Sequence, residues 1–467
     1  MSPRRCDPLF LPDGRGRPLG GGAGRVRPVP ETPDVADCRV LSLEPGRAIR
    51  SRVAGILLFL PLLTRLGFDR LVTEAGYPGS EMIPAPSALL SLLALKLLDK
   101  ERRSHIDDFN TDEVLGVFAG LNVLPKKSFA TAYSYRAVRD QQRGLLLGWV
   151  KALAPVMFPE PDGFSLDFHP IPFRGDPAAL DRHYLPLQGK AGPSVLTFFA
   201  LEQSSRCLCY SNANLTRNDQ HGELMRFVEF WHEVTGSDPK WLYFDSKVVD
   251  YAELSRVNQR KIHFVTIRRR GAAILRHLQQ QPASAWNGAV IDIPKQCHTH
   301  IRYIEETVRL RGYEGPIRQF AVTGLGRDRP TLFLTNDFEE TPRESIIRYA
   351  GPNRIEGGLG VSVNFFHLDC LASEVRLNVD LDATLTVIAN GCYRWLASRL
   401  KGFEKADPKQ LFRRFIENAG TVTIHPDRLI VAFDRRSHNP ILREAALRND
   451  SQPIAWLGQR KIEFTYH

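Results

Sequence analysis

The order of strand-like and helix-like segments between residues 163 and 280 constrains the fold of this chain more than any other feature. Strand-like segments are rich in aromatic and β-branched residues, and helix-like segments are amphipathic. In order they are strands at 163–173, 194–202 and 206–214, a helix at 219–236, a strand at 241–245, a helix at 250–260, a strand at 262–267 and a basic helix at 268–280. Strands that alternate with helices predict an α/β fold, in which helices cover a mixed sheet with parallel members.

Two aspartates occupy apolar strand positions in this region. Asp167 lies inside "FSLDFHPI", and Asp245 ends "WLYFD". An ionised carboxylate in such a place is costly unless it is capped, paired or bound to a metal. Asp245 has a simple alternative role as an N-cap, because the stretch after it, "SKVVDYAELSRVNQR", looks helical. Asp167 lies within a strand and has no helix to cap.

Adjacent parallel strands would bring these two carboxylates together, although 78 positions separate Asp167 from Asp245. Two close carboxylates repel, and one takes up a proton unless a cation neutralises both. Mg²⁺ prefers such oxygen ligands, and two ions about 4 Å apart support phosphoryl transfer. A third acidic ligand is needed, and Glu356 in "YAGPNRIEGGLG" is the candidate, on a predicted helix.

Three further residues are weaker candidates. His169 lies two residues after Asp167 on the same strand face, where it either packs beside the site or supports it. Asp369 either replaces Glu356 or caps or pairs locally. Asp176 follows the turn-like "FRG" and is interpreted as a loop capping residue.

Positive charge is concentrated in one part of the chain. The net charge is +10, and the stretch from Ser255 to Arg318 holds twelve Lys or Arg against four Asp or Glu, a surplus of eight. Arg268, Arg269 and Arg270 form a triplet within it. Such a surplus favours contacts with DNA phosphates over a merely solvated surface.

Composition and pattern divide the whole chain into six parts. They are a disordered basic arm at 1–45, a helical DNA-binding region at 46–158, a first part of the α/β core at 159–285, a β-rich insertion at 286–340, a second part of the core with C-terminal helices at 341–450 and a C-terminal tail at 451–467. A long amphipathic pattern at 125–153 carries Arg136, and it fits either a solvated helix face or a DNA-binding surface.

The cysteines and the apolar runs bear on the compartment. Seven cysteines without a CxxC pair argue against a disulfide framework or a zinc site and favour a reducing cytoplasm. The longest apolar run, 53–63, is too short to cross a bilayer, and the N-terminus lacks the apolar segment of a signal peptide. A cytoplasmic protein without a membrane partner is therefore expected.

The motifs around these residues resemble those of the DDE transposases of bacterial insertion sequences, in the insertion-sequence-4-like group. The resemblance extends over about residues 46–450 and rests on "SLDFHPIPFRGD", "FDSKVVDYAEL", "FVTIRRR", "PTLFLTN", "YAGPNRIE" and "FFHLDCLASEV". It matches Asp167 and Asp245 to the two catalytic aspartates of the family and Glu356 to its catalytic glutamate.

The helix expected to carry the glutamate follows the family signature Y-x2-R-x3-E in part. Tyr349 stands seven positions before the glutamate, as in the signature. The position of the signature arginine is Pro352, with Arg354 two residues later, and the position of the family's lysine is Val363.

The resemblance implies an RNase H-like mixed sheet with a β-rich insertion, preceded by an all-helical N-terminal DNA-binding region. It implies two Mg²⁺ ions, with Mn²⁺ as a possible replacement, held by Asp167, Asp245 and Glu356. The implied reaction cleaves DNA at the element ends and joins the freed 3′-hydroxyl to target DNA. Double-stranded DNA is the implied partner of a homodimer at the bacterial nucleoid. The residues expected to contact DNA are Arg136, Arg268, Arg269, Arg270, Tyr349 and Arg354.

Two other functions stay open at this point. A related nuclease would use the same carboxylates to hydrolyse DNA without joining strands. A non-catalytic descendant would keep the fold and bind DNA only, which the altered signature positions Pro352 and Val363 allow. An acid/base glycosidase is a more distant alternative, because it explains neither the basic stretch nor the helical region.

Overall fold

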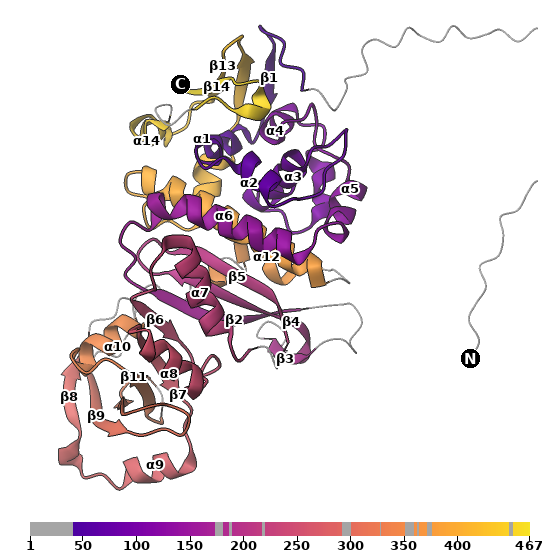
Figure 1. The fold of residues 1–467 in the computed structure, drawn as a ribbon. Coiled ribbons are helices and arrows are strands. Elements are labelled where there is room, and N and C mark those ends of the chain that lie inside the picture. Colours follow the sequence, from indigo (N-terminus) through magenta and orange to yellow (C-terminus); the bar gives the residue numbers. More distant parts are fainter. Residues whose placement is uncertain are drawn as a thin grey trace, which may run out of the picture.

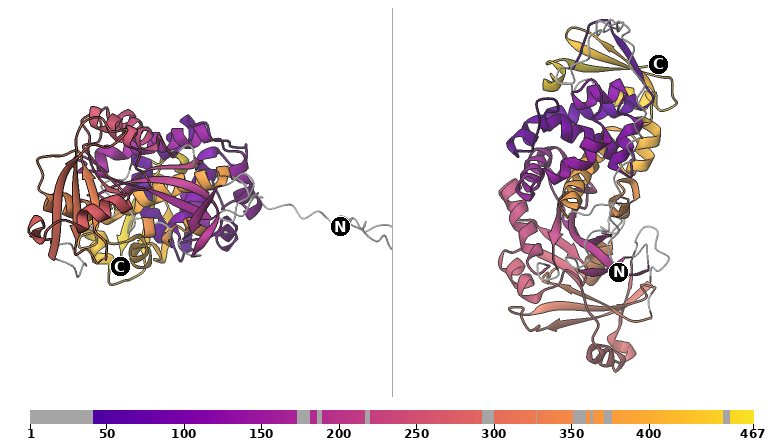
Figure 2. Two further views of the ribbon diagram at one scale, coloured as in Figure 1. Left: turned by 90° about the horizontal axis from the view of Figure 1, so that it is seen from below. Right: turned by 90° about the vertical axis from the view of Figure 1, so that its right-hand side faces the viewer.

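The protein has three tiers along its long axis: a four-stranded sheet, a group of helices and a ten-stranded sheet (Figures 1 and 2). The structure is a computed structural model, and it describes residues 41–172, 181–185, 189–216, 220–291, 300–326, 328–350, 359–361, 364–370, 376–447 and 452–467. Most of the expected basic arm, residues 1–40, lies outside the described part.

The ten-stranded sheet has the mixed character that the sequence predicts. Its strands are β2 (Phe164–Pro172), β3 (Arg182–Leu185), β4 (Lys190–Glu202), β5 (Cys207–Leu215), β6 (Trp241–Phe244), β7 (His263–Arg268), β8 (Asn287–Val290), β9 (His300–Val308), β10 (Ile317–Thr323) and β11 (Thr331–Thr335). β2, β6 and β7 are adjacent and parallel, whereas β4 pairs with β2, and β5 with β4, in antiparallel fashion. The predicted α/β architecture with a mixed sheet is confirmed.

The strands expected as a β-rich insertion extend this sheet at one side. β11 pairs with β7, and the order continues through β10 and β9 to β8, all antiparallel. Helix α9 (Ala272–Gln279) and the 3₁₀ turn η6 (Ala283–Ala285) connect β7 to β8. The basic stretch from Ser255 to Arg318 therefore runs through β7, β8, β9 and the start of β10, at one side of the sheet (Figure 1).

Helices cover both faces of the parallel strands. On one face α7 (Glu223–Thr235) places Phe227 and Trp231 against Phe164 of β2, with ring centroids 5.3 and 4.4 Å away. Helix α8 (Tyr251–Gln259) connects β6 to β7. On the other face α10 (Pro342–Ala350) packs Ile346 against Tyr243 and its apolar neighbours. This second face carries the candidate site.

The helical tier is built largely from the N-terminal region. Its elements are η1 (Ala54–Phe59), α1 (Leu60–Arg65), α2 (Phe68–Glu74), α3 (Ala85–Leu97), η2 (Arg103–Asp108), α4 (Glu113–Ala119), α5 (Lys127–Ala132), η3 (Tyr133–Tyr135) and α6 (Arg139–Met157). The pattern at 125–153 does not form one helix. Val138 is extended and its N–H donates to the side chain of Gln141, so a new helix begins at Arg139.

Helix α12 (Arg376–Arg399) joins the helical tier to the ten-stranded sheet. The carboxylate of Asp380 accepts a hydrogen bond from Ala213 N at 3.3 Å, and Asn390 Oδ1 accepts from Leu208 N at 2.9 Å. Both donors belong to β5, which lies at the outer side of β4. Side chains of α12 thus satisfy backbone groups that an uncovered sheet edge would leave to water.

The four-stranded sheet combines both ends of the described chain. Its order is β1 (Ala48–Ser51), β12 (Gly420–Ile424), β13 (Arg428–Phe433) and β14 (Lys461–Tyr466). Between α12 and this sheet lie α13 (Pro408–Leu411) and the π-helical turn η8 (Phe412–Ile416), and α14 (Asn439–Glu444) and η10 (Ala455–Leu457) precede β14. The N-terminal region is therefore not entirely helical, and part of the expected tail is a paired strand.

Candidate active site

Asp167 and Asp245 stand at the same level on neighbouring parallel strands. The β2–β6 register pairs Leu166 with Phe244. Asp167 is the next residue of β2, and Asp245 is the first residue after the end of β6. Neighbouring strands lie about 4.8 Å apart, and residues at one level of a parallel pair point to one face. The structure thus brings these two predicted site residues side by side, on the face that α10 covers in part.

Asp245 does not cap the helix that follows it. Its Oδ1 accepts a hydrogen bond from Lys247 N at 2.7 Å, which closes a short turn, and Lys247 Nζ lies 4.0 Å from Oδ2. Helix α8 begins at Tyr251 and is capped by Asp250, which accepts from the N–H groups of Ala252 and Glu253. The interpretation of Asp245 as an N-cap is wrong, because the chain makes a turn at 245–250 before the helix begins. Asp250, a second residue able to cap, then takes the N-cap position.

His169 and Asp369 form an ion pair next to Asp167. His169 lies two residues further along β2 on the same face, and its Nε2 is 2.7 Å from Asp369 Oδ1. Both side chains are largely buried. Asp369 belongs to η7 (Leu368–Cys370), which packs on β2. It therefore pairs with a residue 200 positions away rather than locally.

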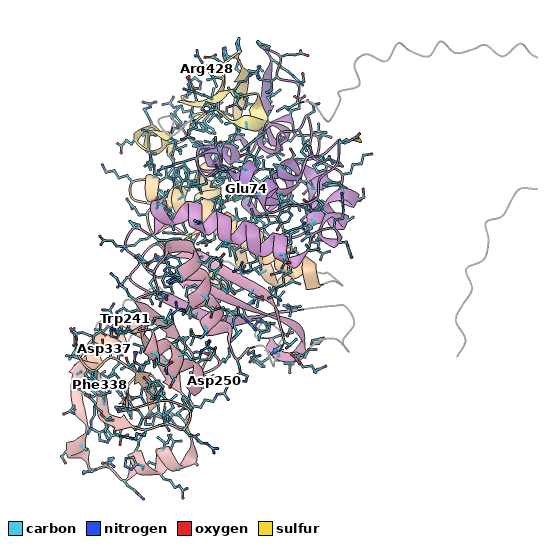
Figure 3. The ribbon with its side chains drawn as sticks, in the orientation of Figure 1. Glu74, Trp241, Asp250, Asp337, Phe338 and Arg428 are labelled. Carbon is cyan, nitrogen blue, oxygen red and sulfur yellow. The ribbon has the colours of Figure 1, made fainter. Side chains whose placement is uncertain are left out.

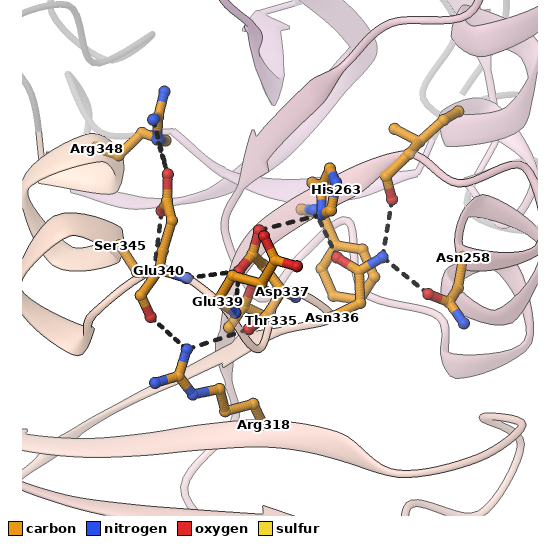
Figure 4. Close-up of polar contacts among 12 residues, drawn as sticks. Asn258, His263, Arg318, Thr335, Asn336, Asp337, Glu339, Glu340, Ser345 and Arg348 are labelled. Carbon is orange, nitrogen blue, oxygen red and sulfur yellow. Dashed lines mark hydrogen bonds and ion pairs between the residues drawn. The ribbon is translucent and has the colours of Figure 1, made fainter.

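The start of α10 is fixed by a buried polar network (Figure 4). Asp337 accepts from the N–H groups of Glu339 and Glu340, and the buried Arg318 donates to the carbonyl of Asp337 at 3.3 Å. The carboxylate of Glu340 is 2.7 Å from Arg348 Nη2. These contacts hold the helix against the face of the sheet that carries the two aspartates.

Residues 351–358, which directly follow α10, lie outside the described part of the chain, and these include Glu356 and Arg354. The ring of Tyr349, near the end of α10, lies against Phe333 at 5.3 Å. The structure therefore brings together two of the three predicted acidic residues.

The donor set at this place suits a hard cation. Among the residues that the structure describes, no group of three or more His, Cys, Asp and Glu is placed to hold a metal ion. Asp167 and Asp245 nevertheless offer carboxylate oxygens from one face of the sheet, which are the ligands that Mg²⁺ prefers. The ammonium group near Asp245 shows that this carboxylate accommodates a positive neighbour. The two aspartates fit one side of a metal site.

The basic triplet begins one residue beyond this level on the next strand. The β6–β7 register pairs Phe244 with Thr266, so Asp245 is level with Ile267 and Arg268 comes next. Arg268 is half-buried and donates to Gln319 Oε1 at 2.5 Å, whereas Arg269 and Arg270 are exposed. Arg269 and Arg270 therefore follow β7 at the same edge of the sheet as the aspartates.

Two other residues bear on the expected DNA contacts. Arg136 is exposed and donates to Gly79 O at 3.1 Å, so one part of its guanidinium is already engaged. Lys247 carries no sequence signal of its own except its place two residues after Asp245 in "FDSK". In the described part of the chain, no helix combines the length and the apolar character needed to span a membrane.

Comparison with known proteins adds little to this geometry. No protein-family model and no curated protein matches the chain. Among solved structures, the chain is similar to the piggyBac transposase of a cryo-EM synaptic complex with hairpin DNA. The identity is 13% and the TM-score 0.45, over 79% of this chain and 82% of that one. A likeness this weak does not decide what this chain does.

Proposed function

We propose that this chain is a DDE-type DNA transposase with an RNase H-like catalytic domain. The observation that carries the proposal is the placement of Asp167 and Asp245 at one level and on one face of adjacent parallel strands. The sheet order β5-β4-β2-β6-β7, with the last three strands parallel, supports the RNase H-like assignment. Glu356 is proposed as the third acidic ligand.

The proposed site works on DNA phosphodiesters. Asp167, Asp245 and Glu356 would hold two Mg²⁺ ions, or Mn²⁺ in their place, and bound ions of this kind supply Lewis acidity to both the attacking and the leaving oxygen. The chain's own contribution is to fix the carboxylates on rigid strands and to hold the DNA backbone. Lys247, Arg269 and Arg270 lie where a bound phosphate backbone would need positive partners.

The proposed reaction has two parts. The protein binds the ends of its element, cleaves a strand there by hydrolysis, and joins the freed 3′-hydroxyl to a phosphodiester of target DNA. Each step exchanges one oxygen on phosphorus for another, so no oxidant or cofactor other than the cation is required. Two ends must be held together, which supports a homodimer on DNA.

The test uses a labelled duplex that carries the inverted repeats flanking the gene, together with a circular target plasmid. We expect cleavage at the repeat end with Mg²⁺ or Mn²⁺, none with EDTA, and a joined product that contains both label and plasmid. Cleavage without a joined product would identify a nuclease instead. Binding without cleavage in either cation would identify a non-catalytic DNA-binding protein.

A further inference from the structure

A two-stranded ribbon continues the sheet beyond the end of β2. The pairing of β2 with β4 ends at Pro172 and Ser194, and β3 resumes it on β4 at the next residue, with Arg182 opposite Pro193. The last pair in the described residues is Leu185 with Lys190. β3 and the first residues of β4 thus form a ribbon at the right-hand end of the sheet in Figure 1.

One face of this ribbon is the face of the candidate site. Asp167 is opposite Phe199, and the register between β2 and β4 is unbroken to Ser194. Side chains alternate along a strand, so the odd-numbered residues of β4 share the face of Asp167. Arg182 pairs with Pro193 and Tyr184 with Ala191, which places both side chains on that same face.

The ribbon presents an aromatic ring and basic groups to solvent. Tyr184 is 63% exposed, although large apolar side chains are usually covered. Arg182 and Lys190 are exposed as well, and one N–H of Arg182 donates to Ala191 O at 2.9 Å. Nearby Asp181 is half-buried and its backbone carbonyl accepts from Ser194 N. Arginine and tyrosine side chains both bond the phosphates of DNA, so an exposed tyrosine two residues from an exposed arginine suits a DNA backbone.

The distance along the ribbon fits a DNA duplex. Ala191, opposite Tyr184, is eight residues from Phe199, opposite Asp167. At about 3.4 Å per residue this is about 27 Å of strand. Successive base pairs of B-DNA also rise about 3.4 Å, so a duplex along the ribbon would meet Tyr184 about eight base pairs from the carboxylates.

We propose that the exposed face of the β3–β4 ribbon is a DNA-contacting surface, on which the hydroxyl of Tyr184 and the guanidinium of Arg182 contact backbone phosphates. This proposal rests on the proposed function, because the eight base pairs are counted from the DNA phosphodiester bond held at Asp167 and Asp245. The contact is expected about eight base pairs from the cleaved bond, on the duplex that lies across that face.

The test measures binding in EDTA, so that its result does not depend on cleavage. The probe is a 40-base-pair duplex with a flanking inverted repeat, labelled for anisotropy and carrying an uncharged methylphosphonate at successive positions in turn. Tyr184→Ala is expected to weaken binding about tenfold, since a hydrogen bond to a charged group contributes this much or more. A methylphosphonate about eight base pairs from the repeat end should weaken binding of the wild type more than binding of Tyr184→Ala, and at the other positions the two proteins should respond alike.

Two matched variants separate the phosphate contacts from other causes. Tyr184→Phe keeps the ring but lacks the hydroxyl, and it should bind as weakly as Tyr184→Ala. Arg182→Ala should lower the slope of log K against log salt by about one unit, whereas Arg70→Ala, an exposed arginine of α2 that pairs with Glu74, should not change it. Binding by Tyr184→Ala within twofold of wild type, with the same response to every methylphosphonate, would overturn the inference. If wild type cleaves the repeat in the preceding experiment, that result leaves the proposed function standing.

Discussion

At the scale of single residues, Asp245 and Asp250 have separate tasks although only five positions separate them. Asp250 accepts from two backbone N–H groups at the start of α8, so its oxygen completes a helix. Asp245 accepts from Lys247 N within a turn and stands level with Asp167. Asp245 lies at the end of a strand, next to a second carboxylate, and caps no helix. Its carboxylate can therefore take part in chemistry.

This separation predicts the behaviour of two matched variants. Asp245→Asn keeps the shape and the turn but removes the charge, so DNA cleavage should fall by at least about a hundredfold while DNA binding is retained. Asp250→Asn keeps a good cap and should cleave within about threefold of wild type. Cleavage assays and gel-shift titrations on end DNA distinguish these outcomes. Near wild-type cleavage by Asp245→Asn would remove this residue from the site.

The basic triplet also divides at the residue scale. Arg269 and Arg270 are exposed, so replacing both by Ala should flatten the slope of log K against log salt by about two units through lost counterion release. Arg268 is already bound to Gln319, so Arg268→Ala should leave the slope unchanged. Titration of labelled end DNA at several salt concentrations measures both. Equal slopes for all variants would assign the triplet to solubility and move the DNA path toward Arg136.

At the scale of elements, α12 and β5 are held together by buried polar groups. Asp380 and Asn390 stand ten residues apart on α12, which is about 15 Å along the helix at 1.5 Å per residue. Their respective partners Ala213 and Leu208 are five residues apart on β5.

Burial raises the pKa of Asp380 to about 6. The N–H of Ala213 and the nearby Arg139 oppose this rise, and Glu223 adds to it.

The raised pKa of Asp380 predicts how stability depends on pH. The folded protein binds the proton more tightly than the unfolded chain, so stability falls as pH rises from about 4 through about 6 and stays lower above it. Asp380→Asn can still accept from Ala213 N and has no charge to desolvate. Its free energy of unfolding should exceed that of wild type at pH 8 by about 3 kcal/mol, with little difference near pH 4. Urea unfolding at both pH values measures this. Lower stability of the variant at pH 8 would mean that Arg139 compensates the buried charge.

At the scale of the whole molecule, the two ends of the described chain meet in one sheet. β1 pairs with β12, and β14 pairs in parallel with β13, which gathers residues 48–51 and 461–466 at one end of the protein. Figure 3 places Arg428 at this end and Asp337 and Phe338 toward the other. The candidate site is therefore remote from the sheet that joins the chain ends.

This closure predicts that the last residues stabilise the protein. Truncation after Gly458 removes the buried side chains of Ile462 and Phe464 and uncovers Phe433, whose ring stacks on Phe464 at 6.0 Å. The free energy of unfolding should fall by about 4 kcal/mol, at about 2 kcal/mol for each buried side chain. Lys461→Ala, at an exposed position of the same strand, should change it little. Urea unfolding compares the three proteins, and unchanged stability after truncation would restore the expectation of a tail.

Local sequence determined much of the α/β region. The alternation of apolar strands with amphipathic helices at 163–280 predicts the mixed sheet because both periods are written in consecutive residues. The carboxylates of Asp167 and Asp245 were visible as polar groups in apolar strands for the same reason. The cap assignment failed because Asp245 and Asp250 are equally good capping residues, and only the backbone of the turn selects between them.

What joins distant parts of the chain was decided by tertiary structure alone. The sequence carries no local sign that Asp369 pairs with His169, that α12 covers the edge of β5, or that β14 closes a sheet with β1. Such contacts depend on which surfaces meet when separate segments bury their apolar faces, and many pairings satisfy the same local pattern. The β3–β4 ribbon belongs here too, since register and exposure, rather than composition, place Tyr184 on the face of Asp167.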